Sequence, residues 1–174
     1  MKLFVLHGIQ QTSMSIIARE AKTGMGAIYN YFSSKEELIN AIFLEIKQDE
    51  ARFIYEGYEE NGTVKERFDH LHTRMVHYYL DHPVRFDFIN AYYFSPVIRK
   101  EVKIENRRLL NRLYRVFSDG MKRMVIKRLP EDELMTVMIG TLSGFLGWKR
   151  LLQEEIDQKK INHLTLMTWD ALRI

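Results

Sequence analysis

Histidines and a carboxylate with helical spacing are the first groups in this sequence that could do chemistry. His70, His77 and Asp81 are separated by seven and four residues, so a helix would place them on one face. Imidazole and carboxylate groups both bind metal ions. A solvated polar face accounts for such a loose spacing better, and we predict no metal site.

The opposite face of the same segment carries a histidine among large apolar residues. His72 shares that face with Phe68, Met75 and Tyr79, and we expect the face to point inward. A histidine in such surroundings is either a core residue with a satisfied hydrogen bond or a contact to a bound ligand.

The chain offers little else for catalysis. It has no cysteine, which excludes disulfides, thiolate nucleophiles and cysteine-ligated zinc. No nucleophile stands at the spacing of a partner base, and no glycine loop fits a phosphate. We predict no enzyme, no catalytic residue and no cofactor. An enzyme that uses these histidines on a helical bundle remains the alternative.

Composition indicates a globular all-α protein. The 174 residues include 46% hydrophobic and 28% charged side chains but only three prolines and nine glycines. No apolar run reaches the ~20 residues of a membrane span, and the first nine residues lack the pattern of a signal peptide. The sequence thus predicts a cytoplasmic protein without a membrane partner.

Hydrophobic periodicity predicts eight or nine helices joined by short polar breaks. The first ends near Gly8, and Ser13 caps the second. The third is short, and Ser34 with Glu37 forms a capping box at the start of the fourth. The later helices are expected at residues 64–80, 84–94, 97–124, 131–153 and 159–172.

Two short helices with a tight turn between them are typical of a reader of the DNA major groove. Ala18 and Ala21 would let the helices cross closely, and Ile28 and Phe32 would anchor the second one, at residues 25–31, to the core. A helical hairpin that merely packs is the alternative explanation.

The residues of this region resemble the signature of the TetR (tetracycline repressor, AcrR-like) family. The resemblance covers roughly the first 46 residues and is carried by residues 12–21, by Gly26-Ala27-Ile28-Tyr29-Asn30-Tyr31-Phe32 and by Ser34-Lys35-Glu36-Glu37-Leu38. It implies a three-helix DNA-binding domain with a helix-turn-helix at residues 1–46 and a helical effector-binding and dimerisation domain at residues 47–174.

The resemblance also implies which residues meet DNA. Tyr29 and Lys35, together with Ser13 and Ser15, would hold backbone phosphates. Base edges would fall to Thr23, Gly24, Met25, Ala27, Asn30 and Tyr31. Gly24, Met25 and Ala27 stand where the family often has polar residues, so fewer polar groups would reach the groove.

The resemblance implies a pocket for a small-molecule effector behind this region. Apolar and aromatic side chains with a few polar groups are typical of such sites, and the candidates are Phe68, His72, Met75, Tyr79, Tyr92, Tyr93, Tyr114 and Trp148. Ordinary core packing explains the same aromatic residues about as well.

The last two predicted helices carry complementary surfaces. By resemblance we assign them to a four-helix homodimer interface formed by Gly140, Gly144, Gly147, Leu164, Thr168 and Ala171. Packing within one chain is the alternative. The expected function is a ligand-responsive repressor that binds a palindromic double-stranded operator. A helical adaptor with a decayed DNA reader is the rival.

One stretch of the sequence is strongly basic. Residues 99–128 hold eleven Lys or Arg against three Asp or Glu, although the net charge of the whole chain is only +3. An acidic effector or nucleic acid would fit such a segment, but a solvated basic face is the simpler interpretation.

Overall fold

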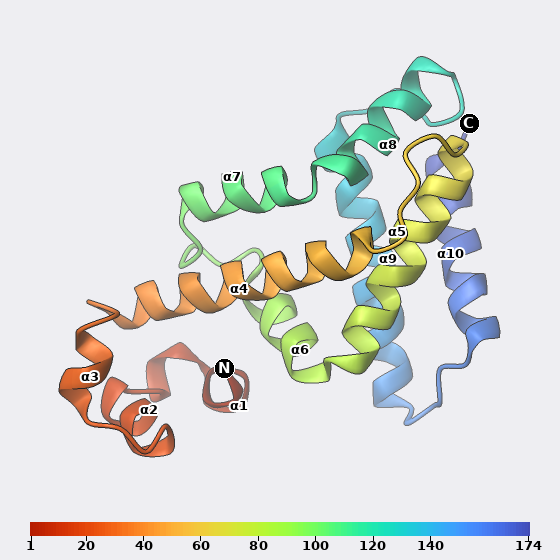
Figure 1. Cartoon of the computed structure of the whole chain (residues 1–174). Helices are drawn as coiled ribbons and strands as arrows, with labels where there is room; N and C mark the ends of the chain where they lie inside the picture. Colours follow the sequence, from red (N-terminus) through yellow and green to blue (C-terminus); the bar gives the residue numbers. More distant parts are fainter. The chain divides into compact units, whose positions relative to one another are not determined.

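A computed structural model describes residues 1–174 and confirms the all-α class (Figure 1). One isolated β-bridge, between Ile126 and Arg173, is the sole extended pairing. The ten helices are α1 (Lys2–Gln11), α2 (Met14–Glu20), α3 (Met25–Tyr29), α4 (Lys35–Tyr55), α5 (Val64–Asp81), α6 (Pro83–Tyr92), α7 (Lys100–Leu109), α8 (Asn111–Lys122), α9 (Glu131–Leu151) and α10 (Gln158–Leu172).

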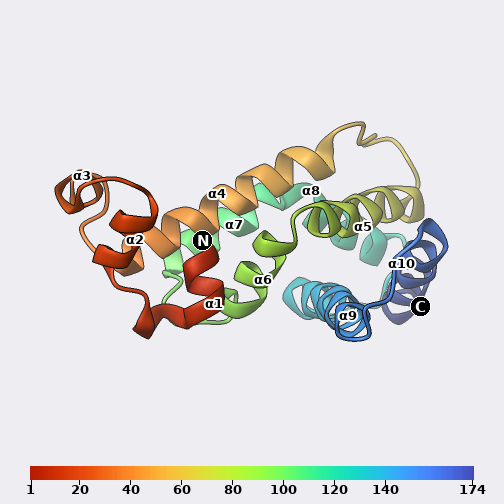
Figure 2. The same ribbon diagram turned by 90° about the horizontal axis from the view of Figure 1, so that it is seen from below.

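The helices group into two compact units. The first comprises residues 1–49 and 82–109, and therefore holds α1 to α3, most of α4, α6 and α7. Within it α1 packs on α6 and α2 packs on α3, as Figures 1 and 2 show. Its core includes Phe4, Ile39, Phe43, Phe88 and Ile98.

The second unit comprises residues 50–81 and 110–174. In it α10 packs against both α9 and α5, and α8 packs against α5 and α9. Figure 2 shows α9 and α10 side by side. Leu71, Met75, Leu113, Phe117 and Met138 are fully buried at its centre. Each unit combines segments that are far apart in sequence. The boundary between the DNA-binding and effector-binding domains at residues 46/47 stays a prediction.

The first helix ends later than predicted. Gly8 interrupts it with φ 72°, a backbone region that suits glycine, but helical turns resume through Gln11. The hydroxyl of Thr12 donates to the carbonyl oxygens of Gly8 (2.7 Å) and Leu3 (3.2 Å). These bonds hold the kinked ends together, so Gly8 is a bend and the helix ends three residues later.

The prediction of a single helix over residues 97–124 is wrong, because the structure has two helices there, α7 and α8. Residues before Lys100 form a turn, and Leu110 departs from helical geometry (φ −91°, ψ 18°) between α7 and α8. No glycine or proline marks Leu110, so periodicity gave no sign of the break. The break falls where the chain passes from the first compact unit to the second.

The predicted helix starts are confirmed at α2 and α4. Ser13 caps α2, since its Oγ accepts from the Ile16 N–H. At α4, the Oγ of Ser34 accepts from the Glu37 N–H at 3.1 Å. The Glu37 carboxylate reaches back one residue further than a standard capping box and accepts from the N–H and hydroxyl of Ser33.

None of the ten helices combines the length and apolar composition that a bilayer crossing requires.

Candidate nucleic-acid interface

The turn between α2 and α3 is closed by backbone hydrogen bonds. Lys22 takes the left-handed conformation (φ 51°), and the Thr23 N–H donates to the Ala18 carbonyl at 3.0 Å. A left-handed residue followed by this bond is the Schellman termination of a helix. It turns the chain within three residues, so α3 starts at Met25 directly beyond α2.

The short helix α3 lies on the surface, as a reading helix must. Met25 and Tyr29 are 45% and 47% exposed, and Tyr31 just beyond the helix is 80% exposed. The other predicted base contacts, Thr23, Gly24, Ala27 and Asn30, are exposed too. The predicted phosphate contacts Ser13 and Ser15 are exposed at the start of α2, with their hydroxyl oxygens 2.8 Å apart.

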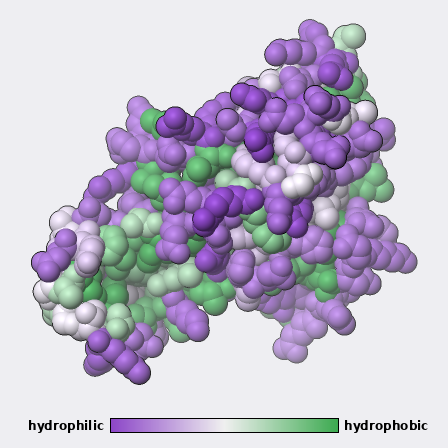
Figure 3. All heavy atoms as spheres, in the orientation of Figure 1, coloured by the Kyte–Doolittle hydropathy of each residue, from purple (hydrophilic) through white to green (hydrophobic).

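Two side chains attach α3 to the interior less deeply than expected. Ile28 and Phe32 are half-buried, and Ala21, predicted to allow close helix crossing, is exposed. Met14 and Ala18 are the buried residues of α2, at 8% and 3% exposure. The helices α2 and α3, called the head below, therefore have both buried and half-buried apolar attachments. At the end of the molecule that holds them, Figure 3 shows pale and green areas beside purple ones.

The glycines of α3 have no internal reason to be glycine. A Cβ added to Gly24 or Gly26 would meet no atom within 4 Å, and neither residue has a positive φ. Inside the protein both positions tolerate a side chain. The absence of side chains leaves the backbone open to close approach by a partner from outside.

Lys35 is engaged inside the first unit. This half-buried residue donates through its Nζ to the carbonyl oxygen of Ile9 on α1. An ammonium group has three donors, so two remain for a phosphate. Lys35 therefore ties α1 to the start of α4 at the place where the resemblance puts a phosphate contact.

Asn40 joins two distant segments of the first unit, a role that sequence reasoning missed. Its Nδ2 donates to the carbonyl oxygens of Glu36 (2.7 Å) and Val97 (2.8 Å), and its Oδ1 accepts from the Arg99 N–H (2.9 Å). Only 5% of Asn40 is exposed. An amide among the apolar residues of α4 was the available signal, because buried amides require partners.

In the second unit, the inward face of α5 is as predicted. Phe68, His72 and Met75 are fully buried and Tyr79 nearly so. The ring of His72 stacks on Phe68 with centroids 5.4 Å apart. Its Nδ1 lies 2.9 Å from the Thr165 hydroxyl, whereas its Nε2 is buried without a hydrogen-bond partner.

The other four predicted pocket residues do not join this face. Tyr92 and Tyr93 belong to the first unit, where the Tyr92 hydroxyl donates to the Phe4 carbonyl at 2.9 Å. The Tyr114 hydroxyl donates to the Asp132 carboxylate at 3.3 Å. Trp148 is 59% exposed, so it lines no interior space of the protomer.

A cavity of about 310 Å³ lies beside the α4–α5 connection. It is lined by Gly57, Tyr58, Glu59, Gly62, Glu66, Arg67 and His70. The Arg67 side chain is nearly buried and is held by the Tyr58 hydroxyl and by Asp119 at 2.9 and 2.8 Å. None of the predicted pocket residues lines this cavity.

His70 and the residues expected near it form no metal centre. The Nε2 of His70 lies 3.2 Å from the Ile54 carbonyl, so this nitrogen carries a hydrogen and donates. No three His, Cys, Asp or Glu side chains of the chain are grouped as metal ligands.

The predicted dimer residues divide between two environments. An added Cβ on Gly140, Gly144 or Gly147 would meet no atom within 4 Å, and all three residues are exposed on α9, as is Ala171 on α10. Leu164 and Thr168 are buried inside the protomer, where the Thr168 hydroxyl contacts that of Thr141 at 3.0 Å. The apolar stripe of α10 therefore packs on α9 of the same chain.

Sequence comparisons match the chain to two protein families, one over each part of its length. Residues 1–42 match "Bacterial regulatory proteins, tetR family", and residues 43–174 match "Tetracyclin repressor-like, C-terminal domain". A relative in Bacillus subtilis (strain 168), named "Uncharacterized HTH-type transcriptional regulator YhgD", is 24% identical over 140 residues, which are 79% of this chain and 72% of that protein.

Solved structures share the fold. A TetR family transcription regulator from Marinobacter aquaeolei VT8 gives a TM-score of 0.89 at 20% identity and covers 99% of this chain and 90% of its own. A putative tetR family regulator from Shewanella sp. PV-4 gives 0.85 at 22% identity, over 99% of this chain and 93% of its own.

Proposed function

Because this chain belongs to the TetR family of bacterial regulatory proteins and is a DNA-binding transcriptional regulator, we propose that it acts as a homodimeric, ligand-released repressor. The observation that carries the proposal is the exposure of α3, which follows α2 directly after the turn at Lys22. At Gly24 and Gly26 no side chain covers its backbone. The protein works in the cytoplasm, where its DNA lies, and catalyses no reaction.

DNA reading belongs to the head. Two copies of α3 enter successive major grooves about 34 Å apart on a near-palindromic operator. Asn30 and Met25 face base edges, while Tyr29, Lys35 and the two serines of α2 face phosphates. Apart from the half-buried Lys35, these side chains are exposed, which supports this assignment, and the hydrogen bond from Lys35 to the Ile9 carbonyl positions its ammonium.

The dimer interface belongs to the outer face of α9 and α10. Val137, Gly140, Gly144, Trp148 and Leu151 are exposed and follow the 3-4 spacing of a helix-pairing stripe. The glycines let two helices approach closely, and the exposed apolar side chains beside them mark a surface suited to contact. Because Leu164 and Thr168 are buried inside the protomer, the exposed Leu166 and Met167 take their place in the proposed contact.

The effector site belongs to the inner face of α5. The buried Nε2 of His72 is a polar atom without a hydrogen-bond partner, and a hydrogen-bonding group of a ligand would satisfy it. A ligand releases DNA only if it binds one arrangement of the dimer better than the other. The effector therefore carries an apolar body and one group that hydrogen-bonds to an imidazole.

The DNA-binding proposal is tested with duplexes selected by the wild-type protein from a random library. A single near-palindromic sequence should emerge, and Tyr29→Ala should weaken its binding at least tenfold. If no sequence is selected, and the wild-type protein shows no DNA affinity that Tyr29→Ala could reduce, the result would favour the helical adaptor with a decayed DNA reader.

The dimer proposal is tested by sedimentation. Gly144→Glu and Trp148→Glu should each give monomers of unchanged helicity, because both positions are exposed in the protomer. The matched exposed change Leu6→Glu in the first unit should leave the dimer intact. Monomeric wild-type protein at micromolar concentration would contradict the proposal.

A further inference from the structure

Helix α7 sorts its charges onto two sides. Lys100, Lys103 and Arg107 follow one another at spacings of three and four residues, so they form one exposed stripe. Glu101 and Glu105 form a second stripe along the helix. Arg108 lies 3.8 Å from Glu105, whereas Lys100 and Lys103 have no carboxylate partner.

This basic stripe begins beside the first turns of α4, the helix that follows α2 and α3 in the chain. The N–H of Arg99 donates to Asn40 Oδ1, and Asn40 also holds Glu36 on the first turn of α4. The Glu37 carboxylate accepts hydrogen bonds from the hydroxyl and N–H of Ser33 at the α3–α4 junction, and these bonds, with a smaller contribution from the charge of Arg99, lower the pKa of Glu37. All these residues belong to the first compact unit, in which α7 runs beside α4 (Figure 1).

We propose that Arg99, Lys100 and Lys103 form an auxiliary phosphate-binding edge that contacts the DNA backbone flanking the segment read by α3. This inference rests on the proposed function, because it extends the same DNA surface. Exposed like charges on consecutive turns repel one another, and a phosphate strand relieves that repulsion. Such contacts add affinity and orientation without reading sequence.

Salt dependence measures the number of phosphates that a protein neutralises. Each contact contributes about 0.9 to the slope of log affinity against log salt concentration. The probe is a fluorescein-labelled duplex of mixed sequence, about 40 base pairs long, titrated at several KCl concentrations. A mixed sequence suffices because backbone contacts are made on any duplex.

Two triple variants remove equal charge from different units. Arg99→Ala/Lys100→Ala/Lys103→Ala should lower the slope by about two to three. Arg115→Ala/Lys122→Ala/Arg123→Ala changes three exposed residues of the second unit, on α8 and directly after it, and should leave the slope within error. All six residues are exposed, so thermal unfolding should change little in either variant.

Other outcomes overturn the inference in distinguishable ways. An equal fall of the slope in both variants would mean that net charge acts diffusely, and an unchanged slope in both would mean a merely solvated face. If the wild-type protein itself shows no salt-dependent binding, the DNA-binding proposal fails together with this inference. A reduced slope in the α7 variant alone supports it.

Discussion

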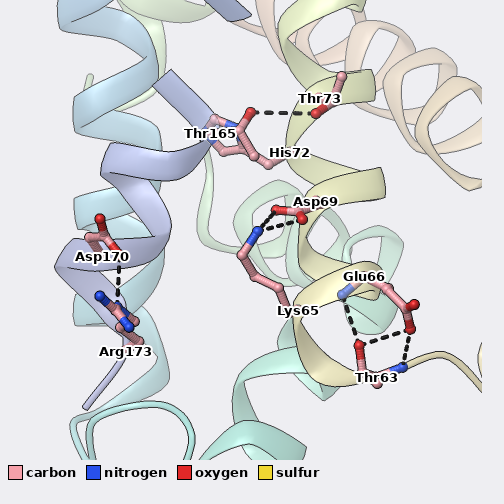
Figure 4. Close-up of polar contacts among 9 residues, drawn as sticks. All are labelled: Thr63, Lys65, Glu66, Asp69, His72, Thr73, Thr165, Asp170 and Arg173. Carbon is pink, nitrogen blue, oxygen red and sulfur yellow. Dashed lines mark hydrogen bonds and ion pairs between the residues drawn. The ribbon is translucent and has the colours of Figure 1, made fainter. Parts of the chain in front are cut away.

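His72 and Thr165 are 93 positions apart in sequence, yet the Nδ1 of His72 lies 2.9 Å from the Thr165 hydroxyl oxygen inside the second unit (Figure 4). The contact joins α5 to α10. The Thr73 hydroxyl lies 3.4 Å from the same oxygen. Since no charged group surrounds His72 to stabilise an imidazolium, the contact holds a neutral ring.

This burial makes stability depend on acidity. Burial lowers the pKa of His72 to about 4, below its ordinary value of 6.5. The unfolded chain therefore binds a proton that the folded chain excludes, so stability rises with pH between 4 and 6.5 and falls on acidification. Between pH 7 and pH 5 the free energy of unfolding should drop by about 2 kcal/mol from this group alone.

Urea unfolding at the two pH values measures this dependence. His72→Gln cannot titrate, so the difference between pH 7 and pH 5 should shrink by about 2 kcal/mol relative to wild type. His163→Gln alters an exposed histidine of α10 and should keep the wild-type difference. A His72→Gln protein with the full wild-type pH dependence would show that His72 is not the titrating group.

Asn40→Ala should destabilise the protein strongly. The substitution leaves the Val97 carbonyl and the Arg99 N–H without their partner, and buried groups left in this state cost about 1–3 kcal/mol each. Denaturant unfolding should show a loss of about 2–4 kcal/mol. Asn61→Ala, at an exposed turn residue, should change stability by less than about 0.5 kcal/mol.

The sequence predicted the fold class and most helices because apolar periodicity and capping residues are local signals. Ser13 and Ser34 each marked a helix start that the structure has. Leu110 carries no local signal, since it is a buried apolar residue at the point where the chain leaves one compact unit for the other. For this reason the division between α7 and α8 could not be predicted.

The candidate site, too, could be predicted only where the signals are local in sequence. Exposure of Met25, Tyr29 and Tyr31 follows from the pattern of the two short helices. The Asn40 contacts and the burial of Leu164 depend on which segments meet in space. Trp148 illustrates the ambiguity, because a large aromatic residue on α9 suits a pocket and a dimer surface equally, and only its exposure separates them.

Lys35→Gln should affect both folding and DNA binding. Loss of the bond to the Ile9 carbonyl should lower the free energy of unfolding by about 1 kcal/mol. Loss of one phosphate contact should also lower the salt slope for a duplex by about 0.9. If stability falls while the slope stays unchanged, Lys35 serves only to hold α1.

Gly120 packs against Ile126 so closely that even one methyl group does not fit. A Cβ on Gly120 would lie 2.6 Å from Ile126 Cδ1 and 3.0 Å from its Cβ, and Ile126 is fully buried. Ile126 cannot move freely, because the backbone on both sides is hydrogen-bonded to the C-terminal segment, from Lys127 N–H to Leu172 and from Ile174 N–H to Val125. Gly120→Ala should therefore cost about 1–3 kcal/mol.

A double-mutant cycle separates this clash from any general effect of the new side chain. Ile126→Ala alone should cost about 2–5 kcal/mol, because it empties a core position. In the Gly120→Ala background the same change should cost at least 1 kcal/mol less, because the added methyl group then has space. Additive costs, measured by denaturant unfolding, would mean that the two residues do not constrain each other.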